Sequence, residues 1–138
     1  MKILDKKNHT AKMLSIAGAL MFALSACASD QRLSFTGTWE SFRAAVMTNR
    51  VDDAGALTSF PLRSIDSGHP DIASATVFRE RFKAIFEPIV IEMMKSGACE
   101  TGKGDPGYEA NCGNGYMIFG FEIRENRYKL SYFGSINE

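Results

Sequence analysis

The chain of 138 residues has room for one small domain but not for two, because its first 26 residues differ in character from the rest. The 112 residues after them hold 12 basic and 15 acidic residues, so a neutral total hides a mildly acidic domain. With no basic cluster in that part, nucleic acid and anionic lipid headgroups are excluded as its expected partners. About 42 % of its residues are apolar, which is typical of a globular domain and not of a disordered chain.

The first 26 residues have the three-part layout of a secretory signal peptide. Four lysines lie within residues 1 to 12, residues 13 to 26 are uncharged, and small residues follow. A bilayer core of about 30 Å needs about 20 apolar residues, so a run of this length is short for a transmembrane helix. We therefore expect residues 1 to 26 to be a signal peptide that is removed.

The uncharged run ends in Leu24, Ser25, Ala26 and Cys27, which resembles the lipobox of bacterial lipoproteins. The resemblance implies cleavage before Cys27 and attachment of diacylglycerol and a further acyl chain such as palmitate to that cysteine. Two or three long chains hold a protein on a membrane much more firmly than one. Because Ala28 and not aspartate follows, similarity to enteric lipoproteins implies the outer membrane, with the domain facing the periplasm. The alternative is ordinary cleavage after Ala28, which would release a soluble periplasmic protein.

The other two cysteines, Cys99 and Cys112, form an even pair once Cys27 is acylated or removed. Export to an oxidising compartment favours a disulfide between them. The residues between them, 100 to 111, are rich in glycine and have little apolar surface to bury, so we expect a stapled loop. Closing a loop of this length contributes about 3 kcal/mol in the chain-entropy model.

The expected elements begin after a lipidated tether over residues 27 to 37, and a single domain occupies residues 38 to 138. Spacings of three and four place Phe35, Trp39, Phe42 and Val46 on one stripe of a helix that ends near residue 48. A short helix follows over 51 to 58, and then a strand over 60 to 65. Since a proline at the second position of that strand lacks an N–H, the strand should lie at a sheet edge.

The second half of the domain is predicted to contain two more helical segments and a β-hairpin. Apolar spacing indicates a helix over 78 to 89, broken by Pro88 and continued to a C-cap at Gly97. Strands over 116 to 124 and 127 to 136 flank Glu125 and Asn126. Alternation puts four side chains on one face of the first strand: Met117, Phe119, Phe121 and Ile123. On the second strand it puts three side chains on one face: Tyr128, Leu130 and Tyr132. We predict an α+β fold with amphipathic helices packed on one face of a small antiparallel sheet.

A second resemblance covers most of residues 35 to 136. The helix with the pattern W-x-x-F-x-x-A-V, followed by F-P-L, a long helix and C-terminal strands, is similar to the nuclear transport factor two/ketosteroid isomerase superfamily; the matching residues are Trp39, Phe42, Ala45, Val46, Phe60, Pro61 and Leu62. This resemblance implies a cone-shaped sheet with a pocket, and a family of isomerases, dehydratases and binding domains without activity. The chain is shorter in strands than that family.

The sequence contains few groups of residues whose spacing suggests catalysis, metal binding or ligand binding. Asp66, His69 and Asp71 share one loop, where a carboxylate could orient the imidazole as a general base, although a solvated turn has the same composition. Zinc, calcium and phosphate motifs are incomplete, so we expect no metal, no cofactor and no catalytic set. A cluster of phenylalanines could line an apolar ligand pocket, but such spacing is typical of core: Phe78, Phe82, Phe86, Phe119 and Phe121.

The sequence therefore favours a lipid-anchored envelope protein whose domain binds a small apolar ligand or another envelope protein without catalysis. Two alternatives stay open. One is an isomerase or dehydratase, which would need a carboxylate and a tyrosine that converge in a pocket. The other is a periplasmic immunity or inhibitor lipoprotein, which would need an exposed patch complementary to its target.

Overall fold

The computed structural model describes residues 30–137, with side chains from Phe35 onward, and residues 34–137 belong to one compact unit. The elements in chain order are α2 (Asp30–Met47), α3 (Val51–Ala56), β1 (Thr58–Ser64), α4 (Ala75–Ile85), α5 (Pro88–Ser96), β2 (Cys99–Lys103), β3 (Tyr108–Cys112), β4 (Met117–Arg124) and β5 (Arg127–Gly134). The predicted α+β class is confirmed. In the described residues no helix has the length and apolar character needed to cross a bilayer.

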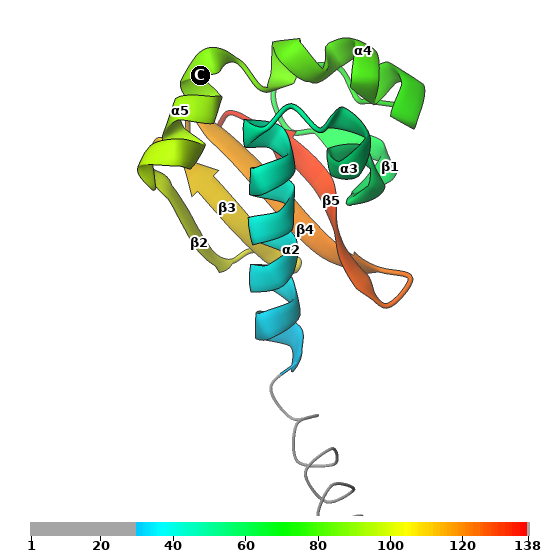
Figure 1. Ribbon diagram of the computed structural model, residues 1–138, viewed down its shortest axis with the longest axis vertical. Helices are drawn as coiled ribbons and strands as arrows, with labels where there is room; N and C mark the ends of the chain where they lie inside the picture. Colours follow the sequence, from blue (N-terminus) through cyan, green and yellow to red (C-terminus); the bar gives the residue numbers. More distant parts are fainter. Residues whose placement is uncertain (1–29, 138) are drawn as a thin grey trace, which may run out of the picture. The chain divides into compact units, whose positions relative to one another are not determined.

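The five strands form one open sheet in the order β1-β5-β4-β3-β2. Strands β2 to β5 pair antiparallel with their neighbours, and β1 joins the far side of β5 in parallel. Figure 1 shows α2 crossing one face of this sheet, with α4 beyond the end of that helix and α5 beside its last turns. The predicted antiparallel arrangement thus holds for four strands, and the parallel pairing of β1 is new.

The helices begin and end where local chemistry directs them. The hydroxyl of Ser74 accepts a hydrogen bond from the N–H of Val77 and caps α4. Pro88 occupies the first turn of α5, where its missing N–H leaves no helical bond unmade. Gly97 ends α5 in the left-handed conformation at φ 78°, as predicted. Helix α2 already begins at Asp30, so residues expected in the tether are helical.

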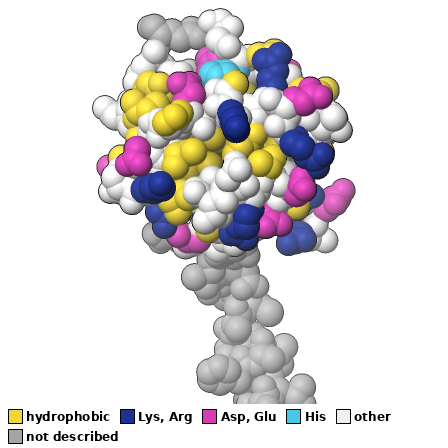
Figure 2. All heavy atoms as spheres, turned by 45° about the horizontal axis from the view of Figure 1, so that its top comes forward, with side chains coloured by type: hydrophobic (Ala, Val, Ile, Leu, Met, Phe, Trp, Pro, Cys, Tyr) yellow, Lys and Arg dark blue, Asp and Glu magenta, His cyan; other side chains and the backbone are white. Residues whose placement is uncertain are grey.

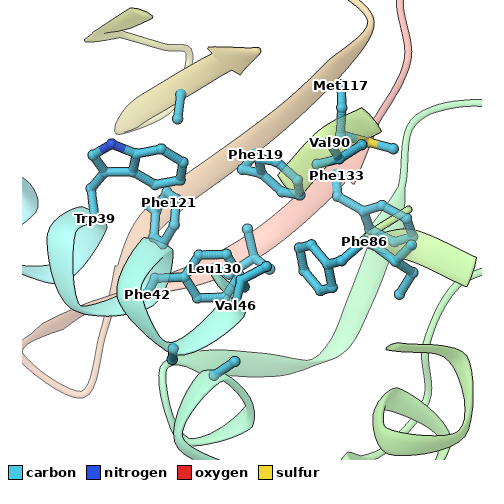
Figure 3. Close-up of a cluster of buried hydrophobic side chains, with 14 of the residues drawn as sticks. Trp39, Phe42, Val46, Phe86, Val90, Met117, Phe119, Phe121, Leu130 and Phe133 are labelled. Carbon is cyan, nitrogen blue, oxygen red and sulfur yellow. The ribbon is translucent and has the colours of Figure 1, made fainter. Parts of the chain in front are cut away.

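The core is a layer of aromatic rings between α2 and the sheet (Figure 3). The ring of Phe42 is fully buried and lies 5.6 Å from that of Phe121 and 5.8 Å from that of Phe86, measured between centroids. Trp39 stacks at 6.3 Å on Phe119. These rings come from the two stripes predicted from the sequence and from β4, so the predicted core is confirmed, except that Ile123, expected on the same face of β4, is exposed.

The alternation predicted for β5 is wrong at Tyr132. Phe121 pairs with Leu130, but the next residue of β4, Gly120, pairs with Tyr132, so Ser131 is an extra residue in β5. This β-bulge reverses the alternation, because one inserted residue turns every later side chain to the other face. Phe133 therefore enters the core and Tyr132 lies on the face of the sheet away from α2.

The segment between the two bridged cysteines is a β-hairpin and not the loop that we expected. Five residues of β2 pair with five of β3. The side chains of residues 100 to 103 are exposed. An edge strand of this kind buries little side-chain surface and is held by backbone hydrogen bonds, so its sequence lacks the apolar alternation of a central strand.

Candidate functional site

A pocket of about 160 Å³ lies on the helical side of the sheet, where α2, the end of α5 and β2 meet. Two of its lining residues, Trp39 and Met94, are almost fully buried and present little apolar surface to it. Polar side chains from α2 and β2 form much of its rim; the full lining is Thr36, Trp39, Glu40, Arg43, Met94, Gly97, Cys99 and Thr101. No pattern in the sequence indicates this pocket, because its residues are distributed over three elements that only the fold brings together.

Arg43 fixes one wall of the pocket. Its Nη1 donates a hydrogen bond to the carbonyl of Met94 at 2.8 Å, and its Nη2 lies 2.8 Å from the carboxylate of Glu40. The carbonyl belongs to the last turn of α5, where helical partners are missing. Arg43 therefore satisfies an otherwise unpaired acceptor and ties α2 to the end of α5.

The disulfide between Cys99 and Cys112 fixes the opposite wall. The two cysteines face each other across β2 and β3, with sulfur atoms 2.06 Å apart. Cys112 is fully buried in the core, whereas Cys99 lines the pocket. The predicted bridge is confirmed, and it fastens the edge strand to the rest of the sheet. Cys27, the predicted lipid site, lies outside the described residues.

Thiol labelling of the native protein tests this bridge. We expect an alkylating reagent to label neither Cys99 nor Cys112 without reduction, because both sulfur atoms are bonded. Mass spectrometry of the peptides before and after reduction gives the result. Labelling of both residues in unreduced protein would contradict the bridge.

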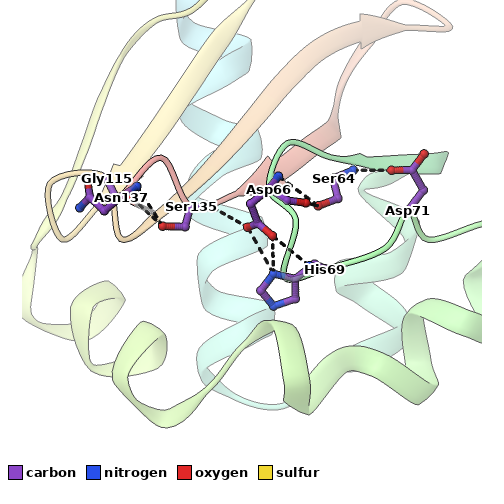
Figure 4. Close-up of polar contacts among 7 residues, drawn as sticks. All are labelled: Ser64, Asp66, His69, Asp71, Gly115, Ser135 and Asn137. Carbon is purple, nitrogen blue, oxygen red and sulfur yellow. Dashed lines mark hydrogen bonds and ion pairs between the residues drawn. The ribbon is translucent and has the colours of Figure 1, made fainter.

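The loop after β1 contains a buried carboxylate and is not the solvated turn that its composition allows (Figure 4). The side chain of Asp66 is only 4 % exposed. One oxygen accepts hydrogen bonds from the backbone N–H of His69 at 2.9 Å and lies 3.1 Å from its Nδ1, and the other accepts the N–H of Ser135 at 2.7 Å. Asp66 thus joins the loop to the chain that follows β5.

The electrostatics of Asp66 favour its ionised form. Burial raises the pKa of this carboxyl, but the hydrogen bond from Ser135 and the contacts with His69 outweigh that effect, so the pKa lies below the usual value of 3.8. His69 packs its ring against Phe133 at 5.5 Å, and its side chain is 23 % exposed. Figure 2 shows a histidine side chain, in cyan, on the surface of the face that it draws. The geometry of a carboxylate that orients an imidazole is present, and its bonds to Ser135 and to the loop backbone give the carboxylate a structural role.

Asp71, the third residue of the predicted cluster, covers the outer edge of β1. Its carboxylate accepts the N–H of Ser64 at 2.8 Å. The next residue, Ile72, exchanges two backbone hydrogen bonds of 2.8 Å with Leu62. The loop that looked like a catalytic candidate therefore pairs the backbone groups of an edge strand.

A second polar constellation lies on the face of the sheet away from α2. Tyr132 lies beside Gly120, and a β-carbon added to that glycine would overlap its ring. The hydroxyl donates a hydrogen bond to Glu109 at 2.9 Å, and the guanidinium of Arg63 lies 5.6 Å from the ring centroid. Burial and the bond to Glu109 raise the pKa of Tyr132, so this hydroxyl stays protonated in neutral solution.

Tyr132, Glu109 and Arg63 form a tyrosine row on this face of the sheet. The row contains the carboxylate and the tyrosine that an isomerase would require, but these two side chains do not converge in the pocket. Glu109 pairs with Gly120, and Ala110 pairs with Phe119 of the core, so Glu109 points away from the helices. Thr101 pairs with Ala110 and points toward them. The tyrosine row and the pocket consequently lie on opposite faces of the sheet. Within residues 30 to 137 no three His, Cys, Asp or Glu side chains are grouped to hold a metal ion.

The structure thus defines an α+β domain with a helix-lined pocket beside one sheet edge. Comparison with known proteins found no matching family model, curated protein or solved structure.

Proposed function

We propose that this protein is a bacterial outer-membrane lipoprotein, acylated on Cys27, whose α+β domain faces the periplasm and binds a partner without catalysis. The sequence feature that supports export and acylation is the uncharged run that ends in Leu24, Ser25, Ala26 and Cys27. Acyl chains on Cys27 would supply the membrane contact, since each buried CH₂ contributes about 0.8 kcal/mol.

The bridge between Cys99 and Cys112 is the observation that carries the proposal. Disulfides persist in the periplasm and are rare in the cytosol, so the bridge supports export. It also accounts for two of the three cysteines of the chain and leaves Cys27 as the thiol for acylation.

The geometry of the domain supports binding over catalysis. The pocket is lined largely by polar groups, and Arg43 is held in its wall by hydrogen bonds to Met94 and Glu40, which supports a role in binding a ligand without transforming it. Neither constellation with catalytic composition lies in the pocket, because Asp66 bonds Ser135 in the loop after β1 and Tyr132 bonds Glu109 on the face of the sheet away from α2.

Replacing Cys27 by serine tests the lipid anchor. We expect Cys27→Ser to abolish acylation and to leave either uncleaved precursor or a species cut after Ala28. Membrane fractionation with metabolic labelling by a palmitate analogue measures both outcomes. The matched control is Cys99→Ser with Cys112→Ser, which removes the two bridged cysteines and should leave labelling unchanged. Equal labelling of wild type and Cys27→Ser would contradict the proposal.

A further inference from the structure

The two edges of the sheet differ in how their backbone groups are paired. Along β1, Leu62 bonds Ile72 through both its N–H and its carbonyl, and the N–H of Ser64 bonds Asp71. Pro61 has no N–H to offer. Proteins cover exposed edges in these ways because an open edge accepts further strands. The β1 edge is therefore closed.

The β2 edge has no such cover in the described part of the chain. Strand β2 is last in the sheet and pairs only with β3 (Figure 1). Hydrogen-bonded and non-hydrogen-bonded pairs alternate along an antiparallel ladder, and the latter bring the α-carbons closer. Cys99 and Cys112 have α-carbons 3.9 Å apart and are a non-hydrogen-bonded pair. Two backbone hydrogen bonds just beyond the ends of β2 fit this assignment. The N–H of Gly113 donates to the carbonyl of Ala98, and the N–H of Gly104 donates to the carbonyl of Gly107.

This alternation determines which groups face outward. Glu100 and Gly102 direct their N–H and carbonyl groups to β3, whereas Cys99, Thr101 and Lys103 direct theirs to the free edge. Five exposed or half-buried residues thus present three donors and three acceptors in the spacing of a β-ladder. Only an extended backbone matches that spacing.

The pocket opens beside this edge. Cys99 and Thr101 line it, so the side chains of β2 that point toward the helices form one of its walls. Trp39, Glu40 and Arg43 of α2 form the wall across from them. A strand added to β2 would place the residue opposite Thr101 on the same face as Thr101, and therefore in the pocket.

We propose that the free edge of β2 and the pocket form a peptide-binding groove, in which an extended segment of a partner protein adds as a sixth strand. The segment places one side chain in the pocket between α2 and β2, and the neighbours of that side chain point to the opposite face. Backbone hydrogen bonds supply affinity and the pocket supplies specificity, as in other cases of strand addition. The disulfide holds the edge strand in place before the peptide arrives, which lowers the ordering cost. This inference rests on the proposed binding role and names the class of partner.

Amide hydrogen exchange of the mature protein in mild detergent tests the groove residue by residue. The probe is a display library of random nine-residue peptides, from which the tightest binder is synthesised. In the free protein, the amides of Thr101 and Lys103 should exchange rapidly and those of Glu100 and Gly102 slowly. The bound peptide should slow exchange at Thr101 and Lys103 at least about tenfold and leave Glu100 and Gly102 unchanged.

Two kinds of variant sharpen the test. Thr101→Pro removes an outward N–H without breaking a bond to β3, so it should weaken peptide binding about tenfold. Glu100→Ala, on the opposite face, should change binding less than about threefold. Methylating alternate backbone amides of the peptide needs no change in the protein. Methylation of the amides that face β2 should abolish binding, whereas methylation of the amides that face away from β2 should not.

The outcomes separate the groove from its alternatives. A library without binders, or binders that leave Thr101 and Lys103 unprotected, would overturn the groove; in the second case the broader binding role would stand. Protection of Thr101 and Lys103 that rises with protein concentration in the absence of peptide would assign the edge to a second copy of the chain and would also overturn it. The N-terminal mass of the same sample reads the lipid anchor independently.

Discussion

Replacing Trp39 by alanine should lower the free energy of unfolding by about 3 to 5 kcal/mol, which is a large share of the stability of a small domain. The indole is only 4 % exposed and packs on the rings of Phe42, Phe119 and Phe121. Truncation would remove these contacts and leave a cavity between α2 and β4 that the rigid aromatic layer fills poorly. Urea denaturation of the mature protein, followed by circular dichroism, measures the loss.

Two further variants show whether the loss reflects the core. Phe82→Ala, on the other predicted stripe, should destabilise by a similar amount because Phe82 is 3 % exposed and lies 4.7 Å from the ring of Phe86. Ile123→Ala should cost less than about 1 kcal/mol, since Ile123 is 45 % exposed. A loss below about 1 kcal/mol for Trp39→Ala would contradict the burial of Trp39 in the core and the position of the apolar stripe of α2.

Replacing Asp66 by alanine should lower the free energy of unfolding by about 2 to 4 kcal/mol. The carboxylate accepts hydrogen bonds from Ser135 and His69, and its loss leaves these donors without a partner in a largely buried site. Asp52→Ala is the matched control. Its ion pair with Arg79 is exposed on both sides, so we expect a change of at most about 0.5 kcal/mol.

The pH dependence of stability gives a second readout of Asp66. Its pKa in the folded state lies below the value of 3.8 expected for the unfolded chain, so the unfolded state binds the proton more readily. The stabilisation by Asp66 is therefore present above about pH 4 and is lost as the pH falls through the lower, folded-state pKa. Between pH 5 and 3 wild type should lose more stability than Asp66→Ala. Equal slopes for the two proteins would contradict an ionised, bonded Asp66.

His69→Ala distinguishes a structural loop from a catalytic one. The backbone N–H of residue 69 keeps its bond to Asp66 in the variant, so the loss is confined to the side-chain contacts with Asp66 and Phe133. We expect about 1 kcal/mol, compared with less than about 0.5 kcal/mol for a solvated turn. Unchanged stability in urea melts, together with loss of an enzymatic activity, would favour the enzyme alternative.

Elements with strong local signals were predictable from the sequence. The spacing of Phe35, Trp39 and Phe42 predicted α2, and Pro88 and Gly97 marked the start and end of α5. The turn of the β4–β5 hairpin was also predictable, because Glu125 and Asn126 separate two apolar runs. Both residues adopt positive φ angles, 52° and 64°, a conformation in which asparagine is enriched. In each case a few neighbouring residues carry the information.

Features that depend on distant contacts were not predictable. The bulge at Ser131 leaves no mark on the alternation of β5 in the sequence, so alternation alone predicts the wrong face for Tyr132. The parallel pairing of β1 with β5 joins residues about 70 positions apart, such as Arg63 and Tyr132. The β2–β3 hairpin has a polar, glycine-rich sequence that also suits a loop, and the pocket beside it needs all three of its elements in place.

The mass of the native N-terminal peptide tests the lipoprotein proposal, because the proposed function depends on the fate of Cys27. Protein recovered from the membrane fraction is digested, and its N-terminal peptide is sequenced by mass spectrometry. The lipoprotein proposal predicts a peptide that begins at Cys27 and carries the added mass of diacylglycerol and a further acyl chain. An unmodified peptide that begins at Ser29 would contradict it and would make the protein a soluble periplasmic one.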